Sequence, residues 1–437
     1  MSFVHSHSHD CTKSEIDLFA LPPTQTHIEY GQWVVYKPIS SLADEAPIEF
    51  VIPGQGDEYI DLSHTLLNIK AKILKNDGTV MVAADDEAIG PINNWMHSLF
   101  SQIDVYLNQK IVSSASNNYP YRAYFENLLS YGPAAKNSHL TTVMWYKDTP
   151  GNMGLENNEG LEKRREFTKR SKIVDMIGHV HSDIFNQEKF LLNGVELKLR
   201  LVRSRDTFSL MGVEGYKIKI SEANLLVRRV KVSPSVLISH AKGLEKHTAK
   251  YPITRADVKT NTISTGVRSA SLDNVFNGQL PTRIIVGMVA NAAFNGSYGT
   301  NPFHFETFGL NFASFHVDGQ QIPGVMLTPD FESGEYIRVF HTLFSGTGIH
   351  YSDSGNEISR EDYDKGYALM ALDFTPDLEA HIKSHWSLVR HGSLRLEVRF
   401  QNALPAPVTI ITLFILSPRI FFVTNLINIK GIISHNI

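Results

Sequence analysis

The stretch Leu67-Asn68-Ile69-Lys70-Ala71-Lys72-Ile73 alternates apolar and polar residues with a period of two, and Lys75-Asn76-Asp77-Gly78 follows it. This alternation is typical of a half-buried β-strand, and the Asp-Gly pair tolerates the positive φ angles that close a turn. The same pattern recurs at 102–107, 195–201, 216–220, 223–232, 284–290 and 394–400. Because such strands occur in both halves of the chain, the sequence predicts an all-β protein built from β-sandwiches.

Only a few short helices are expected. Within 118–129, the residues Tyr121, Tyr124, Phe125 and Leu128 follow the i, i+3, i+4, i+7 spacing of an amphipathic helix, which predicts one there. The segment 149–170 is rich in Pro, Gly, Asn and alternating charges, and it predicts a long exposed excursion between strands. This excursion and a second one at 346–361 have no evident partner in their own sandwich, so we expect them to be available to other chains.

The strand pattern breaks between Ser233 and Arg255, where Pro234, a helical stretch around 238–247 and Pro252 follow one another. This is the best candidate domain boundary. It predicts an N-terminal arm at 1–29, a first sandwich at 30–233, a linker at 234–250 and a second sandwich at 251–437. Each half is long enough for eight strands and one or two long loops. The linker is short and poor in Gly and Ser, so we expect the halves to pack on each other and to be inseparable.

Composition excludes several classes of protein. The 437 residues carry 41 basic and 45 acidic side chains, a formal charge of −4, which lacks the cationic excess of a dedicated nucleic-acid binder. The single cysteine, Cys11, rules out an internal disulfide framework and a cysteine-based zinc site. With 42% apolar residues, the chain is expected to be globular.

Two segments indicate whether the chain is secreted or inserted into a membrane. The N-terminus has no apolar run of signal-peptide length after a basic start, so we expect the chain to be made and kept inside a cell. The apolar run 408–416 is interrupted by Ser417-Pro418-Arg419, whereas a membrane-spanning helix needs about 20 apolar residues. This run predicts two buried strands and a turn, and no transmembrane segment.

Two histidine clusters are candidate metal sites. His5, His7, His9, Asp10 and Cys11 crowd potential ligands together, but no packed scaffold surrounds them, so we expect no functional metal there. His179-Val180-His181-Ser182-Asp183-Ile184 resembles the His-x-His-x-Asp-His ligand set of metallo-β-lactamase-like hydrolases, except that Ile184 stands at the final ligand position. In a strand, His179, His181 and Asp183 would share one face, and a polar face or an interface is the expected use.

Signatures of catalysis are weak or absent. The sequence has no Gly-x-Ser-x-Gly elbow and no phosphate-binding Gly-rich loop. The acidic pairs Asp85-Asp86 and Glu361-Asp362 are interpreted as solvated surface. Lys163-Arg164-Arg165 is bracketed by Glu162 and Glu166 and is a poor phosphate clamp. We therefore assign no catalytic, cofactor-binding or metal-binding residue, and we expect no enzyme.

A family resemblance rests on several blocks of sequence. Thr12-Lys13-Ser14-Glu15-Ile16-Asp17-Leu18-Phe19-Ala20-Leu21-Pro22-Pro23-Thr24-Gln25-Thr26 looks like the opening of the major capsid proteins of Polinton (Maverick) elements and adintoviruses. Further blocks that resemble this family lie at 59–63, 90–102, 119–124, 131–136, 145–151 and 190–195. The resemblance is dense from about residue 10 to 235 and thinner to about 407, while 409–437 depart from the family's more acidic ending.

The resemblance implies a double jelly roll, in which two eight-stranded jelly-roll sandwiches stand side by side and perpendicular to a shell. It also implies a homotrimer that forms a pseudo-hexameric capsomer of an icosahedral capsid, assembled inside the host cell. The implied partners are further copies of the chain and a minor, penton-forming single jelly-roll capsid protein. No specific nucleic-acid sequence is implied as a partner.

Two other classes of function remain as alternatives. A jelly-roll lectin or receptor-binding module would show a loop cluster of aromatic residues and carboxylates, and it would be secreted. A cupin-like metal oxygenase or a hydrolase using His179 and His181 would need a third ligand at a known spacing, and the sequence offers none.

Overall fold

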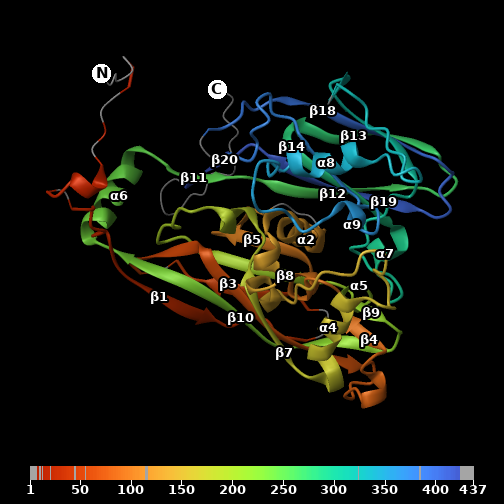
Figure 1. The fold of residues 1–437 in the computed structure, drawn as a ribbon. Coiled ribbons are helices and arrows are strands. Elements are labelled where there is room, and N and C mark those ends of the chain that lie inside the picture. The colour runs from red at the N-terminus through yellow and green to blue at the C-terminus, as the bar shows by residue number, and fades with distance from the viewer. Residues whose placement is uncertain are drawn as a thin grey trace.

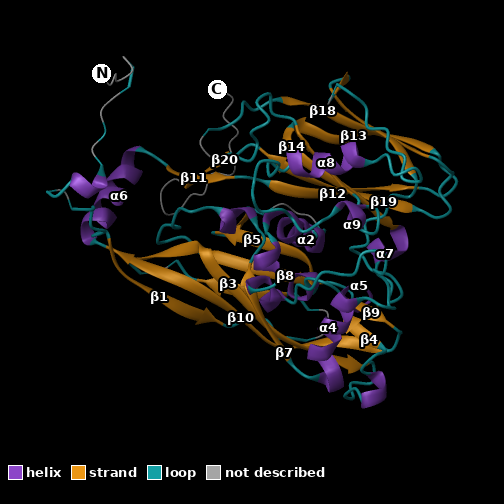
Figure 2. Ribbon diagram, in the orientation of Figure 1, coloured by secondary structure: helices purple, strands orange, loops and turns teal. Residues whose placement is uncertain are grey.

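The architecture is taken from a computed structural model, which describes residues 7–8, 11, 13–19, 21–43, 46–54, 56–113, 117–322, 324–382 and 385–423. Figure 1 shows two groups of strands side by side, the first drawn from red to yellow-green and the second from green to blue. Figure 2 shows that helices lie mainly at the ends of these groups and between them. In the part of the chain that the structure describes, no helix is long and apolar enough to cross a membrane.

The first half is a sandwich of two four-stranded antiparallel sheets with strand orders β1-β10-β3-β7 and β2-β8-β5-β6, and a short pair, β4-β9, lies beside them. Its strands are β1 (Ile28–Tyr36), β2 (Ile48–Ile52), β3 (Glu58–Lys75), β4 (Ile89–Pro91), β5 (Phe100–Leu107), β6 (Lys110–Ile111), β7 (Val174–His179), β8 (Leu197–Arg203), β9 (Leu210–Gly212) and β10 (Tyr216–Val232).

The alternating stretch that predicts a strand is the second half of β3. Leu67, Ile69, Ala71 and Ile73 are buried, whereas the polar residues between them are partly exposed. The predicted turn follows, with the Gly78 amide donating to the Lys75 carbonyl oxygen at 2.9 Å and Gly78 at φ 87°. The predicted strands 216–220 and 223–232 form one long strand, β10, whose register shifts between Ile220 and Glu222.

The second half repeats the first, with sheets β12-β19-β14-β17 and β13-β18-β15-β16 and a separate pair, β11-β20. Its strands are β11 (Ala249–Ile253), β12 (Ala256–Ile263), β13 (Ser269–Gln279), β14 (Pro281–Ala290), β15 (Leu310–Val317), β16 (Gln320–Gln321), β17 (Leu369–Asp373), β18 (His391–Phe400), β19 (Val408–Leu416) and β20 (Arg419–Val423).

Both sandwiches have the same topology. When the eight sandwich strands of each half are numbered in chain order, the two sheets become 1-8-3-6 and 2-7-4-5 in either half. Strands that are distant in the sequence therefore pair within a sheet. Successive strands alternate between the two sheets, except the fourth and fifth, which form a hairpin in one sheet, as in a jelly roll. The prediction of two tandem eight-stranded jelly rolls is confirmed.

The helices are short, as expected. They are α1 (Trp95–Ser98), α2 (Tyr119–Ser130), α3 (Pro133–Lys136), α4 (Glu159–Thr168), α5 (Asp206–Ser209), α6 (Pro234–Lys246), α7 (Asn291–Asn295), α8 (Ile337–Ser345) and α9 (Arg360–Tyr363), with 3-10 turns η1 (Ser14–Ile16), η2 (Ala83–Asp85), η3 (His139–Val143), η4 (Lys169–Ser171) and η5 (Asp183–Asn186). Helix α2 matches the prediction for 118–129, and all four of its predicted apolar positions are buried. Helix α6 matches the helical stretch expected near 238–247.

The prediction of an exposed excursion at 149–170 is wrong. Helix α4 forms there and buries Leu161 and Arg164. Its N-cap is Asn158, whose side chain accepts the Leu161 amide at 3.3 Å. Arg164 needs partners from distant parts of the chain to be buried, and a local pattern of charges does not reveal them. A second error concerns Asp86, which was expected in solvent but is buried and accepts the Arg170 amide at 2.7 Å.

The apolar run near the C-terminus forms two strands, as predicted. β19 is buried along almost its whole length and pairs with both β12 and β14. After Ser417-Pro418 the chain enters β20, which pairs with β11. The divergent residues 424–437 lie outside the described residues.

Candidate functional site: the interface between the two jelly rolls

Aromatic side chains from both jelly rolls pack together around α2. The Tyr124 ring stacks on Phe303 with centroids 4.1 Å apart, and Phe125 contacts Phe305 at 5.3 Å. Tyr121 from the same helix stacks on Phe294 at 5.8 Å. Such pairs add about 0.5–1.5 kcal/mol beyond the burial of their area. One continuous hydrophobic core therefore extends through both halves.

A buried charged cluster lies at one end of this interface. The Arg122 guanidinium contacts Asp183 at 2.7 Å and Glu126 at 2.9 Å, and it donates to the Ala256 carbonyl oxygen at 3.2 Å. Asp183 also accepts the Ala256 amide at 3.1 Å and lies 3.7 Å from the Arg255 guanidinium. Both backbone groups of Ala256, at the start of β12, are thus held by side chains of the first jelly roll.

The candidate metal ligands His179, His181 and Asp183 lie in or next to this cluster. The expectation that they share one face of a strand is wrong. β7 ends at His179, and Asp183 begins η5. Each side chain has a partner of its own. His179 Nε2 bonds Asn186 Oδ1 at 2.8 Å, His181 Nδ1 contacts Glu126 Oε2 at 2.6 Å, and Asp183 pairs with Arg122. Of the three, Asp183 contacts the second half of the chain through Ala256 and Arg255, whereas His181 pairs with Glu126 of the first jelly roll.

Among the residues that the structure describes, the only three His, Cys, Asp or Glu side chains close enough to share a metal ion are Asp377, Glu379 and His385. His385 Nε2 itself contacts Asp377 at 2.9 Å, so this surface group is already paired. Of the N-terminal cluster, His7 and Cys11 are exposed, whereas His5, His9 and Asp10 lie outside the described residues.

We predict that neither histidine cluster carries a required metal. Treatment of the purified chain with EDTA should leave its melting temperature unchanged, because loss of a structural ion removes binding energy from the folded state alone. Metal analysis of the untreated protein provides the second measurement. A stoichiometric ion per chain, or a drop of several degrees with EDTA, contradicts this prediction.

A second buried cluster centres on Asp148. The Arg164 guanidinium contacts Asp148 Oδ1 at 2.6 Å, and the side chains of both residues are 0% exposed. Asn158 of the first jelly roll and Asn301 of the second each donate to the same carboxylate at 3.0 Å. Tyr367, also from the second jelly roll, donates its hydroxyl to the Asp148 carbonyl oxygen at 2.7 Å. The Asp148 cluster therefore joins the two jelly rolls.

Two lysines add contacts near the Asp148 cluster. Lys136 Nζ donates to the Asn356 carbonyl oxygen at 2.6 Å, and burial lowers the pKa of Lys136 to about 8. Lys147 Nζ donates to the Glu357 carbonyl oxygen at 2.6 Å and contacts Asp362 at 2.8 Å. The expectation that Asp362 is solvated surface is therefore wrong. Part of the predicted excursion 346–361 contacts the first jelly roll of its own chain.

The sequence patterns single out Asp183 and the aromatic residues of α2, but not the residues of the Asp148 cluster. Arg164 was interpreted as one of three surface cations, and Asp148 was noted only as part of a family block. The i, i+4 spacing of Arg122 and Glu126 on α2 is a local signal that points to an ion pair. No local signal indicates that Asn301 and Tyr367 meet Asp148, because these contacts span 153 and 219 residues of sequence.

Buried histidines lie beside the charged cluster around Arg122. His97 packs its ring 4.6 Å from His181, and its Nδ1 bonds the Tyr119 hydroxyl at 2.9 Å. Burial, and then the neighbouring His181 and His179, hold the pKa of His97 well below its ordinary value. Burial also lowers the pKa of His179. Although burial alone would raise it, the pKa of Glu126 lies below its ordinary value because of Arg122 and His181.

We predict that stability falls as the pH is lowered from 7 to 5. The unfolded chain takes up protons near pH 6.5 at His97 and His179, whereas the folded chain, in which burial lowers both pKa values, takes up fewer. Unfolding therefore becomes more favourable as the pH falls, by up to about 1.4 kcal/mol per pH unit for each histidine. Glu126 contributes only below about pH 4.5, where its unfolded form is protonated. Melting temperatures measured across this range test the prediction, and His97→Gln should make the slope shallower. An equal slope in both proteins contradicts it.

Exposed apolar residues gather near the start of the chain. Phe19 is 98% exposed, and Leu18 and Leu21 nearby are also exposed. The next element, β1, is an edge strand: within the described part of the chain it pairs only with β10. Its Trp33 side chain is about half exposed. Large exposed apolar side chains and unpaired strand edges are each typical of surfaces that contact another protein.

No family model matches the chain. The uncharacterized protein F54H12.2 of Caenorhabditis elegans is 27% identical over 407 residues, which cover 88% of this chain and 93% of that protein.

Solved structures match along nearly the whole chain. A chain of the 3.5 Å structure of the Sputnik virophage matches with a TM-score of 0.62 and 10% identity, over 97% of this chain and 93% of that one. The Faustovirus major capsid protein matches with a TM-score of 0.58 and 9% identity, over 94% and 93%. The mavirus major capsid protein matches with a TM-score of 0.50 and 11% identity, over 97% and 94%. The chain shares the fold of double jelly-roll major capsid proteins of large DNA viruses and virophages.

Proposed function

We propose that this chain is the major capsid protein of a Polinton-like or adintovirus element. The observation that carries the proposal is the double jelly roll itself, which matches solved structures of viral capsids and capsid proteins over 94–97% of this chain. The family blocks in the sequence support the same assignment. In this role the chain works through its surfaces and not through a reaction, so it needs no catalytic residue, cofactor or metal.

The proposed assembly unit is a homotrimer, in which six jelly rolls form a pseudo-hexameric capsomer of an icosahedral shell. Residues 1–29 act as an arm, 30–233 and 251–437 as the two jelly rolls, and 234–250 as their linker. The exposed apolar side chains near Phe19 and the free edge of β1 support contacts between subunits. The further partners are neighbouring capsomers and a minor, penton-forming single jelly-roll protein, and the chain resides in the virion capsid.

Light scattering on a size-exclusion column tests the trimer. We expect a mass near three chains, because subunit interfaces of obligate oligomers are large and apolar. Phe19→Glu should weaken the trimer, since it places a charge on the proposed contact surface. Val80→Glu, at another exposed apolar position, is the matched control and should leave the mass unchanged.

Negative-stain microscopy of the same sample should show pseudo-hexagonal particles. A chain that stays monomeric across protein concentrations and salt conditions contradicts the trimer and revives the reading as a jelly-roll lectin or receptor-binding module.

A further inference from the structure

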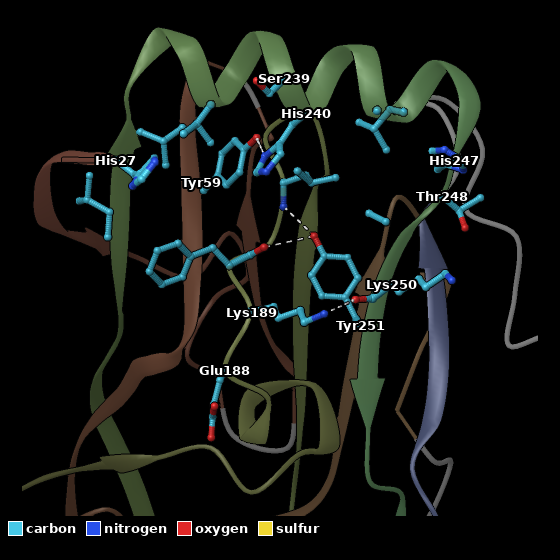
Figure 3. Close-up of a pocket in the computed structure, with 18 residues that line it drawn as sticks. His27, Tyr59, Glu188, Lys189, Ser239, His240, His247, Thr248, Lys250 and Tyr251 are labelled. Atoms are coloured by element: carbon cyan, nitrogen blue, oxygen red, sulfur yellow. Dashed lines mark hydrogen bonds between the residues drawn. The ribbon is translucent and has the colours of Figure 1, made fainter. Parts of the chain in front are cut away.

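An apolar pocket of about 620 Å³ lies beneath α6, beside the linker between the jelly rolls. Figure 3 shows α6 crossing over it, with His240 pointing down toward Tyr59 and with Tyr251 of β11 reaching across to the 188–192 loop. Its apolar walls come from four parts of the chain, namely Ile28 in β1, Phe190 in the loop, Val232 in β10 and Leu244 in α6. None of the α6 residues is fully buried, so the apolar side of this helix is only partly covered.

Four of the polar side chains that line the pocket, Tyr59, His240, Tyr251 and Lys189, already have partners. The Tyr59 hydroxyl bonds His240 Nδ1 at 2.8 Å. The Tyr251 hydroxyl accepts the Leu192 amide and donates to the Phe190 carbonyl oxygen, each at 3.1 Å. Lys189 Nζ donates to the Lys250 carbonyl oxygen at 3.3 Å. The pocket therefore offers an occupant mainly aliphatic and aromatic surface, which favours an apolar segment over a charged ligand.

The C-terminal strand of the described chain, β20, ends at the rim of the pocket, and an apolar segment follows it in the sequence. β20 pairs antiparallel with β11 and places Val423 opposite Ala249, which lines the pocket together with Lys250 and Tyr251. β20 thus runs toward the C-terminal end of α6. In Figure 3, β20 lies directly beside the β11 strand that carries Tyr251.

The sequence that follows Val423 has the right composition and reach. Residues 424–437 carry the aliphatic side chains Leu426, Ile427, Ile429, Ile432, Ile433 and Ile437, and their only formally charged side chain is Lys430. Helix α6 is about 20 Å long at 1.5 Å per residue, whereas fourteen extended residues reach more than about 40 Å. The segment can therefore follow the whole length of the pocket from its starting point at Val423.

We propose that residues 424–437 dock, within the same chain, into the apolar pocket beneath α6. Docking buries the aliphatic side chains of the segment and covers the open side of α6. The segment then ties the linker to the last strand of the second jelly roll. This proposal does not depend on the capsid role, because it concerns contacts within one chain.

Photo-crosslinking of the full chain tests the docking. The photoreactive residue p-benzoylphenylalanine is placed at Leu244, which lines the pocket, and the crosslinked peptides are identified by mass spectrometry. We expect crosslinks to peptides from 424–437 in a product that runs as one chain on a denaturing gel. The matched control places the probe at Ile238 on the same helix, which is 56% exposed and does not line the pocket, and it should give no such peptide.

Crosslinks to 424–437 at the mass of two chains mean that a second copy supplies the segment, and this overturns docking within one chain. Crosslinks to other segments, or none, overturn the proposal as well. A second measurement uses a chain that stops after Val423 and a fluorescent dye that binds apolar surface. Truncation should raise the dye signal several-fold, and a synthetic peptide of residues 424–437 should reverse the rise. Unchanged dye binding on truncation overturns the proposal even if the crosslinking variants fold poorly.

Discussion

Residues 1–233 expressed alone are expected to form aggregates or mixed oligomers, and not a soluble monomer. Removal of the second jelly roll uncovers Tyr121, Tyr124 and Phe125, each of which is no more than 2% exposed in the whole chain. It also takes away Phe303 and Phe305, the rings on which Tyr124 and Phe125 pack. A contiguous apolar face of this kind promotes association. Light scattering and dye binding measure the outcome.

The control is a chain that is cut after it has folded. A protease site inserted between Lys246 and His247, at the end of α6, allows cleavage of the purified full-length protein. We expect the two pieces to elute together, because the aromatic core and the Arg122 and Asp148 clusters hold them without the linker. A soluble, monomeric first half that melts cooperatively, or two cut pieces that separate, contradicts a shared core.

The β-architecture could be predicted from the sequence because it depends on local alternation. In β3, the side chains that the period of two places inward are the ones that the structure buries. The same holds for α2, where Tyr121, Tyr124, Phe125 and Leu128 face the core. These signals reflect burial of one face of an element, which each element's own sequence records.

The contacts that join the jelly rolls could not be predicted in this way. Asp148 and Arg164 lie in a polar segment, and Asp148 accepts hydrogen bonds from Asn301 and Tyr367 of the second jelly roll, which the local sequence does not indicate. The His179-x-His181-x-Asp183 pattern suggested metal ligation by its spacing alone. In the fold these side chains face Asn186, Glu126 and Arg122 instead, which come from elements that the spacing does not include.

Arg164→Met is expected to destabilise the protein by about 3–5 kcal/mol, the usual loss when one partner of a buried ion pair is removed. The Asp148 carboxylate is fully buried and would keep only the amide donors of Asn158 and Asn301. The carbonyl oxygens of Pro91 and Tyr146 would lose the Arg164 donors at 2.8 and 2.6 Å. Denaturant unfolding monitored by fluorescence measures the change.

A second substitution separates the buried charge from the lost packing. If the loss comes mainly from an unpaired carboxylate, adding Asp148→Asn to Arg164→Met removes that charge and should recover part of the stability. Lys169→Ala, which breaks the exposed contact with Glu166 just beyond α4, serves as the surface control and should leave the unfolding midpoint unchanged. A loss for Arg164→Met no larger than for Lys169→Ala contradicts the role of the Asp148 cluster. If the double variant is as unstable as Arg164→Met alone, removing the Asp148 charge has changed nothing. The loss of stability then comes from packing and from the two carbonyl oxygens that lost their donor.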